Sequence, residues 1–434
     1  MAFRYFPHTP EDVREMLERI GVESLDDLYS DVPSDFIYKG EYDLAPAMTE
    51  HQVRCRFEKL ASMNTKLVVF AGAGAYDHFT PSVIPYITSR SEFLTAYTPY
   101  QCEISQGTLR YIFEWQTMIC RLTGLDVANA SMYDGPTAAA EAMRMCIACT
   151  RKRNSVIVSA GLLPNVIKVI QTYARYSGIN VVISEDVVAD VAEGVLDLAG
   201  VIVPSINRFG IVENHTGLAA LVHEMGGLLV EYCDPSALAV VKTPAEWGAD
   251  IAVGDGQSLG IPLCYGGPYV GFMACRKEYM RKLPGRIVGQ AKDAQGRRCF
   301  VLTLQAREQH IRREKATSNI CSNESLMALW CTVYLSLLGP EGLKRVNDLS
   351  YEGAHCLKRR LLDTGKFEDP FPDGIFLKEF VLKPLVAAEK LQQVLLDAGI
   401  FAALSTEEGY VSFCVTEKRS SEEIDKLVDV VKSL

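Results

Sequence analysis

Two strand-like segments end in residues whose side chains could take part in chemistry. "DIAVGDGQSLG" runs from Asp250 to Gly260 and reads as a buried strand entering a glycine-rich turn, in which Gln257 and Ser258 stand. "GLLVEYCD" reads as a second buried strand and ends in Asp234. An amide and a hydroxyl form no Schiff base and are poor metal ligands. The first turn therefore lacks both an amine for a Schiff base and a good metal ligand.

A third segment, "MYDGPTAAAEAMR", predicts a helix that starts at Gly135, Pro136 and Thr137. Its free backbone N–H groups would face an anion such as a phosphate. An equally weighted alternative is that Asp134 caps this helix and occupies its positive end. Asp234 suits an acid that keeps a pyridine nitrogen protonated, but an aspartate before proline is just as common in a structural turn.

A phosphate cradle and a ring acid are two parts of a pyridoxal-phosphate site, and the third part is a lysine that carries the aldehyde. Gln257 and Ser258 stand where the next strand should supply that lysine, while Lys242 and Lys315 do not follow a strand end in the right order. The sequence therefore predicts the scaffold of a cofactor enzyme without its reactive amine. The glycines of "VVFAGAGAYDHF" fail the dinucleotide fingerprint, because Asp77 stands where the third glycine belongs.

Alternating strands and helices must position these segments. Between about residues 155 and 275, short runs that are apolar throughout alternate with helical stretches, which is typical of a parallel sheet covered on both faces. Active sites of such sheets lie beyond the carboxyl ends of the strands. We predict an α/β fold of the aspartate-aminotransferase-like, fold type I class of pyridoxal-phosphate-dependent transferases. It would comprise an N-terminal helical arm (1–65), a large doubly wound domain (66–330) and a small C-terminal α/β domain (331–434).

Composition argues against several other classes. The formal net charge of -10 disfavours nucleic-acid binding. No apolar run approaches the ~20 residues of a membrane-spanning helix, and the 13 scattered cysteines suit free thiols, so we expect a cytoplasmic protein. We favour core packing over metal binding for Cys146 and Cys149, which have no second pair nearby. Four histidines likewise show no spacing that predicts a metal site: His78, His215, His223 and His310.

Longer segments resemble a known family. "TAYTPYQCEISQGTLRYIFEWQTMICRLTGLDVANASMYDGPTAAAEA" and "IRREKATSNICSNESLMAL" closely resemble glycine decarboxylase, the P protein of the glycine cleavage system. "EMLERIGVESLDDL", "GAGAYDH" and "YGGPYVGF" also match, so the resemblance covers essentially the whole chain. The family occurs as one long chain with two homologous halves or as two subunits, and its lysine follows a histidine in the second half. Gln257 and Ser258 stand at those two positions, so the chain resembles subunit 1, which does not carry the Schiff base.

The resemblance implies an activity for an assembled enzyme. Subunit 2 would hold pyridoxal phosphate covalently, and the two subunits together would decarboxylate glycine and pass the aminomethyl group to the lipoyl arm of H protein. We expect a heterodimer or a heterotetramer. Two alternatives stay open: a stand-alone pyridoxal-phosphate enzyme that uses a displaced lysine such as Lys242, and a non-enzymatic paralogue that binds H protein or another partner.

Two loops are candidates for contact with the partner's site. In "KATSNIC", a run of three polar residues offers donors to the phosphate of the partner's cofactor: Thr317, Ser318 and Asn319. The alternative is that this segment only caps the following helix, for which Ser322 or Asn323 would serve.

In "YTPYQ", Tyr97, Tyr100 and Gln101 would line an entrance for the substrate or the lipoyl arm, because apolar rings with polar tips suit a half-wet site. A rigid proline turn with core tyrosines is the alternative. We also expect His78, in "AYDHF", to face this site.

Overall fold

The computed structural model describes residues 7–95, 97–150, 153–305, 309–316 and 318–434. The chain forms two compact units, Met1–Thr65 and Lys66–Leu434. The first unit contains the helices α1 (Pro10–Ile20) and α2 (Glu50–Ser62), with the short 3-10 turns η1 (Asp26–Tyr29) and η2 (Ser34–Phe36) between them. Thr9 caps α1, and Gly21 ends it in the left-handed conformation.

The first unit buries none of its described residues. Its large apolar side chains are exposed, among them Phe36 (81%), Leu44 (77%) and Met63 (75%). A stretch of this length without a core gains little stability from its own packing, because most helical stability in proteins comes from burying an apolar face.

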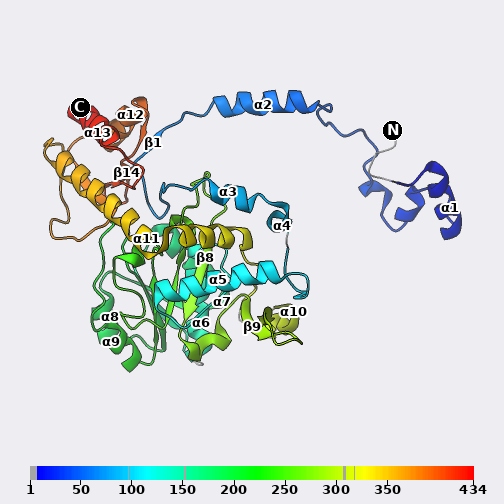
Figure 1. Ribbon diagram of the computed structural model, residues 1–434, viewed down its shortest axis with the longest axis horizontal. Helices are drawn as coiled ribbons and strands as arrows, with labels where there is room; N and C mark the ends of the chain where they lie inside the picture. The colour runs from blue at the N-terminus through cyan, green and yellow to red at the C-terminus, as the bar shows by residue number, and fades with distance from the viewer. Residues whose placement is uncertain (1–6, 96, 151–152, 306–308, 317) are drawn as a thin grey trace. The chain divides into compact units, whose positions relative to one another are not determined.

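A seven-stranded sheet forms the centre of the second unit (Figure 1), in the order β2-β8-β7-β6-β5-β3-β4. Five strands are parallel: β3 (Ser155–Ser159), β4 (Asn180–Ser184), β5 (Leu198–Pro204), β6 (Leu228–Tyr232) and β7 (Ile251–Asp255). β8 (Gly271–Cys275) runs antiparallel to β7, and β2 (Val127–Ala128) antiparallel to β8. This is the doubly wound sheet that the sequence predicts, with β8 alone running opposite to the other strands.

Helices cover both faces of this sheet. α6 (Gly135–Thr150) and α7 (Pro164–Ser177) pack on the face that Val156 and Val158 share, whereas α8 (Val187–Glu193) and α9 (Leu218–Glu224) pack over Ile157. The alternation of β3 residues between two cores explains why its sequence is apolar throughout. A third cluster joins α5 (Gln106–Thr123) to β8 through Trp115 and Phe272.

Smaller elements surround the sheet. They are the helices α3 (Val83–Thr88), α4 (Ser91–Leu94) and α10 (Gln309–Arg312), the 3-10 turns η3 (Ala237–Ala239), η4 (Gly256–Ser258), η5 (Lys277–Lys282) and η7 (Arg313–Lys315), and the hairpin of β9 (Ile287–Lys292) and β10 (Arg298–Thr303).

The helix α11 (Ser325–Leu362) leads from the large sheet into a small α/β part and breaks at Gly339, before Pro340. Its first half is buried with α5, and its second half is buried in the C-terminal core. By length and composition α11 would also suffice to cross a membrane. Core helices commonly meet that criterion, and buried residues lie along both halves of α11. The domain division at residue 330 stays a prediction, since α11 runs through it.

The small part is a four-stranded antiparallel sheet in the order β11-β12-β15-β14. Its strands are β11 (Phe367–Glu368), β12 (Glu379–Pro384), β15 (Val411–Cys414) and β14 (Leu404–Ser405), and α12 (Ala388–Asp397) and α13 (Ser421–Lys432) pack on it. β1 (Val68–Val69) pairs in parallel with β13 (Ile400–Phe401). The segment after β1 thereby passes between the small part and the ends of β6 and β7, where its residues contact both.

Candidate functional site

The carboxyl ends of β6 and β7 bring two of the predicted residues together. Asp234 follows β6, and Ser258 lies in η4 after the neighbouring strand β7. Ser258 Oγ donates to Asp234 Oδ1 at 2.5 Å. Adjacent parallel strands end at one edge of a sheet, which is why two residues 24 positions apart in the chain meet.

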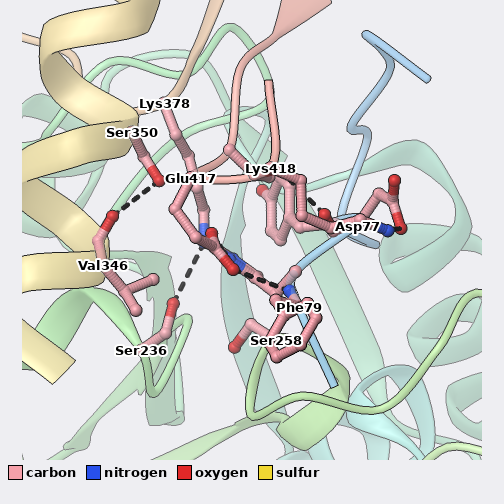
Figure 2. Close-up of polar contacts among 12 residues, drawn as sticks. Asp77, Phe79, Ser236, Ser258, Val346, Ser350, Lys378, Glu417 and Lys418 are labelled. Atoms are coloured by element: carbon pink, nitrogen blue, oxygen red, sulfur yellow. Dashed lines mark hydrogen bonds and ion pairs between the residues drawn. The ribbon is translucent and has the colours of Figure 1, made fainter. Parts of the chain in front are cut away.

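A lysine from the small part reaches the same carboxylate. Lys378 lies directly before β12, and its Nζ is 2.7 Å from Asp234 Oδ2. The ammonium also donates to Ser236 Oγ and contacts His78 Nε2, both at 3.0 Å, and lies 4.0 Å from the centre of the Tyr76 ring. Figure 2 shows Lys378 pointing from the small part toward Ser236. The lysine side chain is 4% exposed, so this is a buried ion pair.

His78 continues this chain of contacts. Its Nδ1 lies 2.7 Å from Glu417 Oε2, and Glu417 Oε1 accepts from the backbone N–H of Phe79. Burial and the charge of Lys378 lower the pKa of His78, so the imidazole is neutral near pH 7. The neutral ring donates from Nδ1 to Glu417 and accepts from Lys378 at Nε2. We call Asp234, Lys378, His78 and Glu417 the buried charge chain.

The two aspartates at the strand ends differ in charge state. Burial alone would raise the pKa of Asp234, but the Lys378 charge and hydrogen bonds from Lys378 and Ser258 outweigh burial and hold the pKa at about 2. Burial raises the pKa of Asp255 to about 7, since that carboxyl has no cationic partner among the groups that shift it. Asp234 is therefore fully ionised at neutral pH, whereas Asp255 is partly protonated.

The start of α6 is occupied by this chain's own carboxyl groups. The backbone N–H of Thr137 donates to Asp134 Oδ1 at 2.8 Å, and that of Gly135 donates to Asp255 Oδ2 at 2.9 Å. These hydrogen bonds support the alternative in which Asp134 caps the helix over the one in which the helix cradles a phosphate. Asp255 supplies a second carboxyl group at the start of α6, and no local sequence pattern predicts this contact.

Gln257 is fully buried and uses its amide on the backbone. Its Oε1 accepts from Tyr76 N at 2.7 Å, and its Nε2 donates to the carbonyls of Tyr76 and Ile261. The turn before Tyr76 is packed closely, because a Cβ on Gly72 would lie 2.7 Å from the Glu379 carboxylate. Gln257 thus fixes the segment after β1 against the end of β7.

The cavity that remains at these strand ends is about 50 Å³, and its lining includes Tyr76, Asp234, Asp255, Ser258 and Glu379. Pockets for small molecules and cofactors usually measure ~300–1,000 Å³. A pyridoxal phosphate would need the Asp234 carboxylate, an open helix start and a lysine. Here Lys378 and Ser258 engage the carboxylate, two carboxyl groups fill the helix start, and Ser258 is no amine. The residues of this chain do not fit the cofactor.

The predicted entrance residues lie on the surface. Tyr97 is 79% exposed, with its hydroxyl 3.3 Å from Ser322 Oγ, and Gln101 is exposed. Tyr100 is 54% exposed, and its hydroxyl accepts from Arg286 at 3.0 Å. His78 is buried in the charge chain instead of lining a surface. Their role at an entrance stays a prediction, but the core position considered for the tyrosines is wrong.

Thr317 lies outside the described residues. Of its predicted companions, Ser318 is buried and its Oγ accepts from Ile320 N at 3.1 Å, whereas Asn319 is exposed. Neither α11 nor its preceding turn is capped by a side chain of Ser322 or Asn323, because Glu324 holds the N-cap position without a capping hydrogen bond. A contact between this loop and a partner's cofactor stays a prediction.

The other lysines considered for a displaced role are exposed, unlike the buried residues of the site. Lys242 is exposed and lies over the Trp247 ring at 4.3 Å, and Lys315 is exposed in η7. Cys146 is buried in the core under α6, as expected. The residues that the sequence did not reveal are Lys378, Glu379 and Glu417. Lys378 and Glu379 could have been singled out in "GIFLKEFVL", because two charged residues interrupt an apolar strand there. The sequence does not indicate which groups these two side chains face.

Fold and site together define a pyridoxal-phosphate fold type I chain whose own cofactor position is filled by protein groups. A family model described as glycine cleavage system P-protein matches residues 3–431, and the chain belongs to this family. Curated relatives agree. A "Probable glycine dehydrogenase (decarboxylating) subunit 1" from Desulforamulus reducens is 48% identical over 98% of this chain and 98% of its own length. The protein of the same name from Carboxydothermus hydrogenoformans is 48% identical over 99% of both.

Solved structures agree with the fold. A crystal structure of glycine decarboxylase (P-protein) of the glycine cleavage system, in inhibitor-bound form, superposes with a TM-score of 0.91 at 40% identity, covering 99% of this chain and 100% of that chain. The sphingosine-1-phosphate lyase of Burkholderia pseudomallei superposes with a TM-score of 0.66 at 13% identity, covering 92% of this chain and 93% of that chain, and shows the shared fold alone.

Proposed function

We propose that this chain is subunit 1 of glycine dehydrogenase (aminomethyl-transferring, decarboxylating) and that it acts only with subunit 2. The assembled enzyme decarboxylates glycine and transfers the aminomethyl group to the lipoyl arm of H protein. The observation that carries the proposal is the strand-end site, where Ser258 replaces the lysine and Lys378 pairs with the retained Asp234. A chain with this site depends on another subunit to bind the cofactor.

Pyridoxal phosphate, held covalently by subunit 2, supplies the electron sink for the loss of carbon dioxide. This chain supplies polar and aromatic groups at the shared site. We assign to Ser318, Asn319 and Thr317 the contact with the partner's phosphate, and to Tyr97, Tyr100 and Gln101 the entrance for glycine or the lipoyl arm. Exposed tyrosines suit such an entrance, since their rings pack against aliphatic groups while their hydroxyls stay hydrated.

The first unit supports a large partner. Sixteen large apolar residues between Met16 and Met63 are at least 36% exposed. A surface of this kind is typical of a segment that is covered in the assembly. We propose a heterotetramer of two such pairs in the cytoplasm, where the 13 cysteines would stay reduced.

The decisive experiment compares the isolated chain with the mixed subunits. After incubation with pyridoxal phosphate and reduction by borohydride, the isolated chain should carry no stoichiometric label at a single lysine and should not exchange bicarbonate into glycine. Adding subunit 2 should give a label on subunit 2 and restore exchange. A stoichiometric label on one lysine of the isolated chain, with exchange activity, would establish the stand-alone enzyme instead. The peptide that contains Lys242 is mapped for this purpose, because Lys242 is the displaced lysine considered for the stand-alone enzyme.

A further inference from the structure

The missing lysine would not by itself prevent a pyridinium cofactor from binding to this chain. The carboxylate that would pair with a pyridine nitrogen, Asp234, is still present at the end of β6 and is ionised. A cofactor bound without a covalent bond would keep this ion pair and its ring contacts. Exclusion of the cofactor from this chain would therefore require another group at these strand ends.

The position of Lys378 meets that requirement. Its Nζ lies 2.7 Å from Asp234 Oδ2, which is the place that a protonated ring nitrogen would take against the same carboxylate. Ser258 already occupies the other oxygen, Oδ1. The two cations cannot share one carboxylate oxygen at this distance, because they repel each other in a buried site.

Other contacts hold the ammonium where it is. Ser236 Oγ and His78 Nε2 accept from it at 3.0 Å, and the Tyr76 ring faces it at 4.0 Å. An aromatic face and a carboxylate around a cation are also the surroundings of a bound pyridinium ring. Figure 2 shows the Lys378 side chain pointing toward Ser236.

We propose that Lys378 is the residue that excludes a pyridinium cofactor from this subunit, by placing its own ammonium against Asp234. The inference deepens the proposed function, since it explains why only one subunit takes up the cofactor. It concerns this chain alone, so its test can fail while the assembled enzyme still works as proposed.

The first test restores the amine with and without Lys378. S258K and S258K/K378A are incubated with pyridoxal phosphate, reduced with borohydride, and the label at position 258 is quantified by peptide mapping. S258K/K378A should carry roughly tenfold more label than S258K, the change that about 1.4 kcal/mol of restored contact to Asp234 produces. S258K/K378M is the matched control, since methionine removes the charge but keeps most of the volume, and it should also label better than S258K, because the proposal assigns the exclusion to the ammonium and not to the volume of the side chain.

Two results would overturn the proposal. Equal labelling of S258K and S258K/K378A would show that Lys378 blocks nothing. No label at position 258 in either variant would assign the exclusion to Asp134 and Asp255 at the start of α6. Circular dichroism and assembly with subunit 2 report whether each variant is folded.

A second measurement needs no cofactor and also serves if K378A is poorly folded. Propylammonium replaces the atoms that K378A removes, so it should raise the melting temperature of K378A and leave the wild-type protein unchanged. Propanol, which has nearly the same shape without the charge, should have no such effect, and D234N should abolish the response of K378A. Equal responses to propylammonium and propanol would show that the position does not select a cation, contrary to the proposal.

Discussion

Glu231 offers a direct test of the electrostatics of this sheet. It lies in β6 between Val203 of β5 and Ala252 of β7, is 0% exposed, and neither carboxyl oxygen has a hydrogen-bond partner among the described residues. Burial alone raises the pKa of Glu231 to about 8 from an ordinary value of 4.5. The group is therefore protonated in the folded protein at pH 7 and ionised in the unfolded chain.

The sign and size of the effect on stability follow from this difference. Between pH 4.5 and 8 the folded state binds one more proton than the unfolded state, so the free energy of unfolding falls as the pH rises. At about 1.4 kcal/mol per pH unit, the loss reaches about 3 kcal/mol at pH 7. Glu231→Gln keeps the shape of the neutral acid and does not titrate. The variant should therefore be about 3 kcal/mol more stable than the wild-type protein at pH 7 and equal to it near pH 4.5.

Urea unfolding of both proteins at pH 5, 6, 7 and 8 measures this difference. Glu224→Gln is the control, because Glu224 is exposed at the end of α9, and it should give curves that follow the wild-type protein at every pH. A stability difference between Glu231→Gln and the wild-type protein that does not grow with pH would refute the reasoning, since it would mean that Glu231 is already ionised in the folded protein.

Three further outcomes follow from the contacts described above. Lys378→Met should destabilise the protein by about 3–5 kcal/mol in urea unfolding, because it leaves the buried charge of Asp234 unpaired. Adding Asp234→Asn should recover more than half of that loss. Additive losses from the two substitutions would contradict the ion pair. Gly72→Ala should cost about 1–3 kcal/mol, because its Cβ would lie 2.7 Å from a buried carboxylate, whereas Gly107→Ala, with no atom within 4 Å of the added Cβ, should be neutral or stabilising. Removal of residues 1–65 should leave the remaining unit folded by circular dichroism but prevent assembly with subunit 2 in gel filtration; unchanged assembly would assign the exposed apolar residues another partner.

Part of the site could be predicted because it depends on local sequence and on strand order. Ser258 and Asp234 each follow an apolar run that reads as a strand, and parallel strands place such ends at one edge. The helix start at Gly135 was recognisable from its composition. The choice between a phosphate cradle and a capping Asp134 was not, because it depends on a carboxyl group, Asp255, that lies 120 positions away.

The rest of the site depends on contacts between distant parts of the chain. Lys378 meets His78 across 300 positions, and Glu417 meets His78 across 339. Periodicity places Lys378 at a strand start but does not say which sheet that strand faces. The packing of the small part against the ends of β6 and β7 decides it, and no local pattern encodes that packing. Local sequence therefore favours Lys242 as a displaced lysine, although that residue lies exposed against Trp247.

The loss of one lysine and the position of another are physically connected. A fold type I site with its cofactor pairs the ring acid with a pyridinium, so the acid is buried and ionised at little cost. Without that cation, Asp234 would either be an unpaired buried charge, which costs several kcal/mol, or take up a proton. Lys378 supplies the missing positive charge from within the chain. Its ammonium helps to hold the pKa of Asp234 at about 2, so the carboxylate stays ionised. A subunit that keeps the ring acid ionised without the cofactor thus needs another residue to take over the role of the ring nitrogen.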